Sequence, residues 1–218
     1  MTLPVQARST DTRRRLIEAG IVAFSQRGHD AVNLTSDVLE PAGVSVGSFY
    51  HQFADKTELL IAILDEAADE RLRAVVPSTP ARTERRSLES DIGEAVERFF
   101  VSLDDEGHLW RIQVRERANT EPRIQERIRR GRVTWRTGIS RIIAPHNRRD
   151  DDALALAVEM IVALCVGLIA TYLDLTPEQR SARRRSLPAQ VASFICDGIR
   201  PMIGAPGRSS ARPVQRGR

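Results

Sequence analysis

The fold is decided by one stretch of the sequence, residues 42–60, which reads AGVSVGSFYHQFADKTELL. Gly43 separates two short helical patterns. Asn33 is the expected cap of the earlier one and Ser45 of the later one. A third and longer pattern begins at Asp55, a residue type that caps helices well. Short helices joined by a glycine turn predict a helix-turn-helix, whose second helix can enter the major groove of a DNA duplex.

The rest of the chain also has the pattern of helices. Apolar residues recur at spacings of three and four, and alternating β-branched runs are missing, which predicts an all-α fold. We expect the first helix from Thr12 to Gly28, with Asp11 or Thr12 as its cap. Leu16 and Phe24 lie on its inner face. Further helices are expected over residues 55–76, 84–104, 107–118, 121–143, 150–175 and 187–203.

The composition is that of a globular protein, because 41% of the 218 residues are hydrophobic and 28% are charged. The two cysteines, Cys165 and Cys196, are too few for a disulfide scaffold or a cysteine-rich zinc site. We expect both to be inert buried thiols. The N-terminus has no apolar segment before its arginines, so it does not resemble a secretory signal, and the cytoplasm is the expected compartment.

One segment, residues 154–173, is apolar over the ~20 residues that a membrane span requires. Glu159 interrupts it and aspartates flank it, which favours a helix buried inside protein over a membrane span. A helix that is apolar all round needs cover on every side. We therefore expect a second subunit to cover one face of this helix.

Within the helix-turn-helix, the second helix is expected to expose small or hydrogen-bonding groups. Phe49 and Phe53 point toward the core, and Gly47 removes a side chain where a duplex has to come near. Tyr50 and Lys56 flank the exposed face and can donate to phosphates. The alternative is a plain helical hairpin with a solvated polar face. The residues expected on the exposed face are Ser45, Val46, Ser48 and His51.

Two stretches carry a resemblance to a known family. Residues 42–60 and the first helix, which reads LIEAGIVAFSQRGHDAV, resemble the TetR family of bacterial transcriptional regulators. The glycines, aromatics and lysine occur in the family's order over about residues 13–65. The resemblance implies an all-α protein with an N-terminal three-helix DNA-binding domain (10–58) and a larger C-terminal helical ligand-binding and dimerisation domain (59–204). The basic tail (205–218) is mostly Gly, Pro, Ser and Arg, and its composition predicts disorder.

The resemblance also implies roles for single residues. Two departures from the family pattern affect them: Leu39 stands where the family usually has alanine, and Pro41 falls in the last turn of the helix before the recognition helix. Because proline removes a donor and crowds a helix, we expect this helix to end at Leu39 or Glu40 and the recognition helix to be tilted. Arg13 to Arg15 either add charge near the DNA or are solvated. In the implied roles, Thr35 and Ser36 approach phosphates, Ser45, Val46 and Ser48 face the bases, and Tyr50, His51 and Lys56 hold the backbone.

The function that the resemblance implies is a ligand-responsive regulator, with repressor as the expected sense. It would bind a palindromic operator as a homodimer and be released by a small apolar or amphipathic effector, such as an acyl-coenzyme A. We expect the dimer to form through helices 150–175 and 187–203, as a four-helix bundle. No metal, cofactor, membrane contact or enzymatic activity is expected. The candidate pocket residues, whose alternative role is to fill the core, are Phe100, Trp110, Val114 and Trp135.

The charges are unevenly distributed, although the net charge is only +4. Residues 111–149 hold twelve basic and three acidic side chains, whereas residues 61–110 hold six and twelve. We favour ion pairs between these two segments. The alternative is a site for an anionic effector, such as a coenzyme A ester, because arginine forks bind phosphates. Residues 1–60 carry a net charge of −1, so DNA affinity would depend on the placement of charge and on two copies acting together.

Other classes of protein compete with this interpretation. Residues 43–47 spell G-x-S-x-G, the nucleophile elbow of α/β-hydrolases, with Ser45 as nucleophile and nominal partners in Asp104, Asp105 and His108. That motif needs a preceding strand, and no strand pattern precedes it. A helical adaptor that binds another protein and no DNA is a further alternative. One acidic helix face lacks histidines at ligand spacing and indicates a solvated or salt-bridged surface rather than a metal site; it consists of Asp65, Glu66, Asp69 and Glu70.

Overall fold

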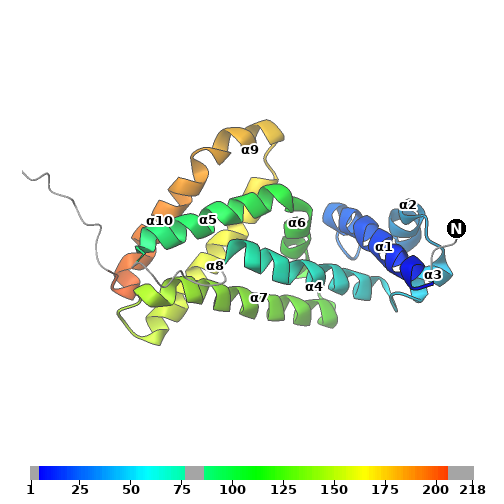
Figure 1. Ribbon diagram of the computed structural model, residues 1–218, viewed down its shortest axis with the longest axis horizontal. Helices are drawn as coiled ribbons and strands as arrows, with labels where there is room; N and C mark the ends of the chain where they lie inside the picture. The colour runs from blue at the N-terminus through cyan, green and yellow to red at the C-terminus, as the bar shows by residue number, and fades with distance from the viewer. Residues whose placement is uncertain (1–4, 77–85, 206–218) are drawn as a thin grey trace, which may run out of the picture.

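The computed structural model describes residues 5–76 and 86–205, and in these ranges the chain is all-helical, as predicted. Figure 1 shows an elongated molecule with α1, α2 and α3 at one end and the later helices arranged behind them. The predicted tail, 205–218, lies outside the described residues except for Ala205. The elements are α1 (Val5–Arg27), η1 (Thr35–Leu39), α2 (Glu40–Ala42), α3 (Val46–Tyr50), α4 (Lys56–Val75), α5 (Leu88–Asp105), α6 (Gly107–Arg115), η2 (Glu116–Ala118), α7 (Pro122–Ile143), η3 (Ala144–His146), α8 (Asp151–Leu173), α9 (Pro177–Arg184) and α10 (Leu187–Ile203).

Helix α1 begins at Val5 rather than at the predicted Thr12. Asp11 therefore lies inside the helix, where its carboxylate pairs with Arg14 at 2.7 Å instead of capping the first turn. The predicted C-terminal stop is confirmed, because Gly28 follows α1 with a φ of +78°. Glycine adopts this left-handed conformation without the steric penalty that a Cβ brings.

The first apolar core lies between α1, the helix-turn-helix and the start of α4. Leu16 and Phe24 are fully buried in it, as predicted for the inner face of α1. Gly20 lets α1 approach α4, because a Cβ at this position would lie 2.8 Å from the Ile63 side chain. Phe49 belongs to the same core and fixes the orientation of α3 against it.

Two predicted helix caps are confirmed in this region. Asn33 Oδ1 accepts hydrogen bonds from the backbone N–H groups of Thr35 at 3.0 Å and Ser36 at 3.2 Å. Asp55 Oδ1 accepts a hydrogen bond from the Glu58 N–H at 2.8 Å and so begins α4. Each carboxylate or amide oxygen satisfies N–H groups that have no partner within the helix.

The helix before α3 does not end ahead of Pro41, which corrects the prediction that it stops at Leu39 or Glu40. The chain instead forms the π-helical turn η1 and continues as α2 to Ala42. In the wider turn the Glu40 N–H donates to the carbonyl oxygen five residues back. The chain therefore passes the proline, which has no N–H to donate, without a break.

Helix α4 connects two cores. Leu59 and Leu60 at its start are buried in the first core. Val75 at its end is buried in the second core, which α5, α6, α7, α8 and α10 enclose. In Figure 1 the helix runs from the helix-turn-helix into the middle of the later helices. A displacement of one end of α4 is therefore felt in both cores.

Helix α9 was not predicted from the sequence. Thr176 and Gln179 form a reciprocal capping box at its start, and Pro177 occupies the first helical position. The sequence Thr-Pro-Glu-Gln at 176–179 contains both signals, so it could have identified this helix.

Helix α8 is not buried on all sides within a single chain, and its cover by a second subunit stays a prediction. It is the one helix of the described chain that is long and apolar enough to cross a membrane, but only 22% of its most apolar window is buried. Val158 and Ile161 face the second core, whereas Leu156 is 57% exposed and Met160 is 50% exposed. One apolar face of α8 is therefore open within a single chain.

Candidate nucleic-acid interface and cavity

Helix α3 begins with two linked hydroxyl groups. Ser45 is its N-cap, as predicted, and its Oγ accepts a hydrogen bond from the Ser48 N–H at 3.2 Å. The two hydroxyl oxygens lie 2.9 Å apart and share a further hydrogen bond. This arrangement orients both groups at the start of the helix, while their remaining lone pairs stay open to a partner.

The outer side of α3 presents an open surface, which we call the reading face. Val46 is 51% exposed and Tyr50 is 58% exposed, and His51 is exposed just beyond the helix. A Cβ built on Gly47 would have no neighbour within 4 Å. Phe49 is fully buried against the core. The reading face consists of the residues around α3 that are exposed or half-buried: Ser45, Val46, Gly47, Ser48, Tyr50 and His51.

Thr35 and Ser36 are exposed at the start of η1, beside the turn that leads to α3. Their backbone N–H groups are occupied by the Asn33 cap. Ser36 Oγ also donates to Asp37 Oδ1 at 3.4 Å. Hydroxyl groups of this kind, rather than the backbone, are what this helix start offers to a phosphate.

Lys56 has a role within the chain that the sequence did not indicate. Its Nζ donates to the carbonyl oxygens of His29 at 2.8 Å and Val32 at 3.1 Å. These bonds hold the loop after α1 against the start of α4. An ammonium group has three donors, so one N–H remains for a phosphate.

The arginines at the start of α1 are engaged by the chain itself. Arg13 pairs with Glu66 at 3.0 Å, and its guanidinium lies 4.7 Å from the centroid of the Phe53 ring. Arg15 Nη1 donates to the Ala42 carbonyl oxygen at 3.0 Å, next to the turn before α3. These two side chains position the helix-turn-helix as well as carry charge.

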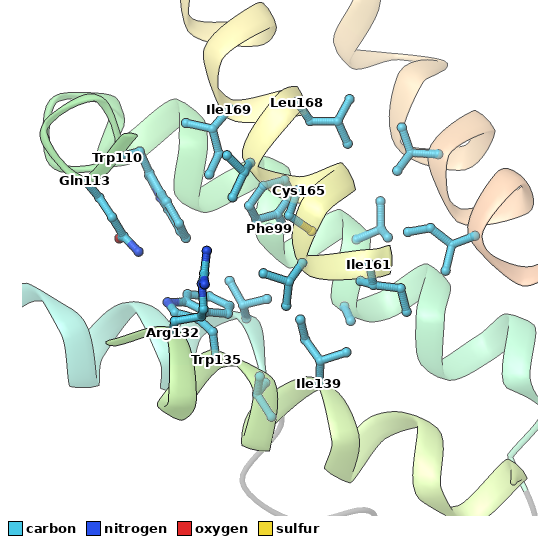
Figure 2. Close-up of a pocket in the computed structure, with 18 of the residues that line it drawn as sticks. Phe99, Trp110, Gln113, Arg132, Trp135, Ile139, Ile161, Cys165, Leu168 and Ile169 are labelled. Atoms are coloured by element: carbon cyan, nitrogen blue, oxygen red, sulfur yellow. The ribbon is translucent and has the colours of Figure 1, made fainter. Parts of the chain in front are cut away.

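A cavity of about 1060 Å³, open solvent at its mouth included, lies in the second core. Residues of α4, α5, α6, α7, α8 and α10 line it. Figure 2 shows Trp110 from α6 and Trp135 from α7 facing each other across one end, and their ring centroids are 5.4 Å apart. Its wall is mostly aliphatic and aromatic with a few polar side chains, which is the lining typical of a site for a small molecule.

Three of the four residues expected at a ligand pocket, Trp110, Val114 and Trp135, line this cavity. Phe100 does not, which corrects that part of the prediction. It points to another side of α5, where it is fully buried with its ring edge-on to Tyr172 at 5.1 Å. Its neighbour Phe99 lines the cavity instead. A binding role for these residues stays a prediction.

Both cysteines are free thiols, and Cys196 is buried. Cys165 is half-buried rather than buried as predicted, and it lines the cavity, where loss of solvent raises the pKa of its thiol to about 12. The thiol therefore stays protonated at neutral pH, which supports the interpretation of Cys165 as an unreactive core residue.

Many arginines of residues 111–149 are paired, as favoured from the sequence, but most of their partners lie outside residues 61–110. Arg127 is buried and pairs with Asp65 of that acidic segment. Its position between α4 and α7 makes it part of the packing of these helices. The other pairs are Arg111–Asp174, Arg123–Asp55, Arg123–Glu121, Arg129–Glu126, Arg130–Glu126 and Arg136–Glu159.

The end of α6 connects the cavity to the helix-turn-helix. Val114 lines the cavity. The next residue, Arg115, donates from Nη1 to the Gln26 carbonyl oxygen of α1 at 2.6 Å. Glu116, which is buried, accepts a hydrogen bond from the His29 N–H at 2.8 Å. Val114 thus lines the cavity, while the next two residues contact the end of α1 and the loop that leads to the helix-turn-helix.

The residues of the hydrolase alternative are not assembled. Ser45 follows a helical turn and caps a helix, rather than following a strand. His108 Nδ1 bonds to Ser25 Oγ at 3.3 Å, and Asp104 Oδ1 accepts a hydrogen bond from the Tyr172 hydroxyl at 2.8 Å. These partners differ from those that a nucleophile, base and acid would need.

No group of three His, Cys, Asp or Glu side chains in residues 5–76 and 86–205 lies close enough to hold a metal ion. The side chains of Asp69 and Glu70 lie outside the described residues. Their neighbours Asp65 and Glu66 form ion pairs, which agrees with a salt-bridged helix face.

The architecture defines a class: an all-helical DNA-binding transcriptional regulator, with a helix-turn-helix at one end and a helical, cavity-bearing region behind it. Residues 16–63 match the family model described as bacterial regulatory proteins, tetR family. The chain is a TetR-family transcriptional regulator, and this family consists of regulators rather than enzymes.

Relatives and solved structures agree with this assignment. The chain is 26% identical over 164 residues to the HTH-type transcriptional activator FasR of Mycolicibacterium smegmatis, covering 75% of this chain and 70% of FasR. Salmonella enterica GusR has a TM-score of 0.68 at 16% identity, covering 94% of this chain and 99% of GusR. The fatty acid degradation regulator FadR from Bacillus halodurans has a TM-score of 0.68 at 15% identity, covering 87% of this chain and 96% of FadR. At these identities, the likeness to GusR and FadR concerns the fold.

Proposed function

We propose that the chain is a cytoplasmic repressor that binds a palindromic operator as a homodimer and is released by a small apolar or amphipathic effector. One observation carries the proposal: a single chain combines an exposed reading face on α3 with an apolar cavity in the second core. In this function residues 10–58 form the DNA-binding domain, and residues 59–204 bind the effector and dimerise.

On DNA, each side chain of the reading face has a chemical role. Val46 offers only apolar contact and suits a thymine methyl group. Ser45 and Ser48 are hydrogen-bonding groups for base edges, and Gly47 permits a close approach. Tyr50, His51 and Lys56, with Thr35 and Ser36 beside them, bind phosphates and so fix the register of the helix on the duplex.

The open apolar faces of α8 and α10 support a homodimer. Leu156 and Met160 of α8 are at least half exposed, and Phe194 of α10 is 69% exposed. Apolar surface of this extent gains about 25 cal/mol per Å² when it leaves water. A four-helix bundle of α8 and α10 from two chains would cover these faces. It would also present two copies of α3, which must enter major grooves about 34–36 Å apart.

The effector would act through the two elements that touch both cores. Val75 of α4 lines the cavity, while Leu59 and Leu60 of the same helix pack under α1. The end of α6 provides the second link, through Glu116 and His29. A ligand can release DNA only as far as it binds the non-binding arrangement of the dimer more tightly.

The names of the relatives bear on effector and sense. FadR is named a fatty acid degradation regulator, which supports an acyl compound, such as an acyl-coenzyme A, as the ligand of the apolar cavity. FasR is named an activator. We propose repression, because a protein bound to an operator blocks other proteins from the same DNA and needs no contact with them to do so. A promoter-reporter assay in a deletion strain separates the two senses.

The test of DNA binding is a salt titration with duplex DNA from upstream of the protein's own gene. We expect preference over a scrambled duplex of equal composition, and a loss of affinity of orders of magnitude between about 50 and 200 mM salt. Equal affinity for both duplexes would contradict operator recognition. Absence of binding at low salt would favour the adaptor.

A further inference from the structure

The cavity has one polar end. Its lining is aliphatic and aromatic apart from Cys165 and three polar residues, Gln113, Arg117 and Arg132. Figure 2 shows Arg132 rising from α7 beside Trp135, toward Gln113 and Trp110 of α6. Arg132 and Gln113 therefore border the aromatic end of the cavity. Arg117 lines the same cavity, near enough to Arg132 for the two charges to interact, and the rest of the wall is suited to hydrocarbon.

The two cavity arginines lack the carboxylate partners that their neighbours have. On the same helix as Arg132, Arg127 pairs with Asp65 and Arg136 pairs with Glu159. Arg132 and Arg117 have no carboxylate within 4.0 Å in the described part of the chain. Both side chains are exposed at the edge of the cavity, so within the described residues two cations lie beside its apolar wall without a carboxylate partner.

The electrostatics of Arg117 agree with this geometry. Partial burial lowers the pKa of its guanidinium, and the like charge of Arg132 lowers that pKa further. The two like charges therefore repel each other, and an anion placed between the two groups would relieve the repulsion. Arginine forks bind carboxylate and phosphate oxygens in bidentate geometry, which suits this role.

We infer that the effector is a hydrocarbon chain with an anionic head, and that Arg117 and Arg132 bind the head while the chain fills the apolar cavity. Gln113 is placed to donate a neutral hydrogen bond to the same head. The chemistry is shared by a free long-chain carboxylate and by a phosphate-bearing thioester of the same chain. This inference rests on the proposed effector function, whose ligand class it specifies.

The position of Arg117 connects head-group binding to the rest of the molecule. It lies in η2, directly after Glu116, which accepts the hydrogen bond from the His29 N–H. A head group that draws Arg117 toward Arg132 therefore acts on the same short helix that contacts the helix-turn-helix.

The test measures binding of three probes with one chain length: hexadecanoate, hexadecanoyl-coenzyme A and hexadecan-1-ol. Isothermal titration of the full-length protein, below the micelle concentration of each probe, gives the Kd values. We expect an anionic probe to bind at least about tenfold more tightly than the alcohol, the ratio that one charge-assisted hydrogen bond supplies. Preference between the two anions identifies the source of the head group.

The variants are Arg117→Gln with Arg132→Gln, and the matched control is Arg129→Gln, an exposed arginine on α7. The double variant should bind anion and alcohol within about threefold of each other, while the control keeps the wild-type ratio. Binding of the alcohol by the double variant also shows that the variant protein is folded. Equal binding of all probes to the wild type, an unchanged ratio in the double variant, or no binding of any probe would overturn the inference.

The salt titration with promoter DNA is independent of these probes. Sequence-specific DNA binding without discrimination between anion and alcohol would overturn the head-group site and leave the regulator intact. Discrimination between anion and alcohol without DNA binding would support the head-group site and overturn the regulator function.

Discussion

The carboxylate of Glu116 accepts a hydrogen bond from the backbone N–H of His29 at 2.8 Å, although the two residues are 87 positions apart in the chain. Glu116 is only 2% exposed, and its second oxygen accepts a hydrogen bond from Asn119 Nδ2 at 2.8 Å. The loop that Lys56 holds from one side is thus held by Glu116 from the other. The end of α1 is clamped between α4 and the cavity-lining end of α6.

The first prediction concerns this clamp. Glu116→Ala removes the acceptor and leaves the buried His29 N–H without a partner, which should lower the free energy of unfolding by about 1–3 kcal/mol. Glu116→Gln keeps an acceptor oxygen and should lose less. Urea unfolding followed by circular dichroism measures both changes.

The control for the clamp is Glu126→Ala, which loses only the exposed ion pairs to Arg129 and Arg130. Such pairs contribute about 0–1 kcal/mol. If Glu116→Ala were no less stable than Glu126→Ala, the hydrogen bond would have no structural role.

The second prediction concerns the reading face. Val46→Ala and Tyr50→Ala remove side chains that are more than half exposed, so both variants should keep wild-type stability within about 0.5 kcal/mol. Each should weaken operator binding by about tenfold or more, since a base or phosphate contact is lost. Fluorescence anisotropy with labelled operator DNA measures the loss. Val133→Ala, on α7 and 55% exposed, is the matched control and should leave DNA affinity unchanged. Wild-type affinity in both α3 variants would remove the reading face as the DNA contact.

Local signals in the sequence predicted local structure well. The caps at Asn33, Ser45 and Asp55 were predicted because a cap is decided by one side chain and the N–H groups two or three residues on. The stop at Gly28 follows from the same short range. Phe49 is buried as predicted, but Val46 lies three residues before it, a spacing that places residues on neighbouring sides of a helix, so periodicity alone does not give the exposed face.

Features that depend on packing between distant segments could not be derived. Phe99 and Phe100 are adjacent and equally apolar, and only the surrounding helices decide that Phe99 lines the cavity. The bonds from Lys56 to loop carbonyl oxygens depend on a backbone path that has no periodicity. The start of α1 at Val5 was missed because the sequence offers Asp11 as a cap, and the competing pair with Arg14 is equally local.

The third prediction concerns the dimer. Phe194→Glu places a charge on a side chain that is 69% exposed on α10 of the single chain, so the monomer should fold normally. If α10 lies in the dimer interface, the charge becomes buried without a partner, and dissociation should increase by at least about 100-fold. Light scattering coupled to gel filtration measures the mass. Val101→Glu, on α5 and 44% exposed, should remain a dimer. A dimeric Phe194→Glu variant would place the interface elsewhere.

The fourth prediction concerns the glycine after α1. Gly28 has a φ of +78°, and a Cβ there would lie 2.9 Å from Arg115 Cδ. Gly28→Ala should therefore lower the free energy of unfolding by about 1–2 kcal/mol from backbone strain alone. Gly93→Ala is the matched control, because a Cβ there has no neighbour within 4 Å. In the middle of α5 the control should stabilise by about 0.5–1 kcal/mol. The same sign for both variants in urea unfolding would contradict the strained position.

The fifth prediction concerns pH and the Asp55 cap. Burial raises the pKa of the Asp55 carboxyl, but the hydrogen bonds from the Arg123 guanidinium and the Glu58 N–H outweigh it and hold the pKa below 3.8. A folded-state pKa below the unfolded value means that the carboxylate stabilises the fold above about pH 4 and that this contribution is lost as the pH falls through the folded-state pKa. Asp55→Ala should therefore cost about 1 kcal/mol at neutral pH and progressively less in acid.

Asp55→Asn separates the cap from the charge, because the amide oxygen still accepts the Glu58 N–H but does not titrate. Its deficit at neutral pH should be smaller than that of Asp55→Ala and should reflect the lost ion pair with Arg123, which spans 2.8 Å between helices α4 and α7. Urea unfolding of the three proteins at about pH 7, 5 and 3 gives the comparison, since the wild type and Asp55→Asn should converge as the carboxylate is protonated. A constant difference between them across this range would show that the charge of Asp55 contributes nothing, and that the first turn of α4 is held by the cap and by packing on the α1 core.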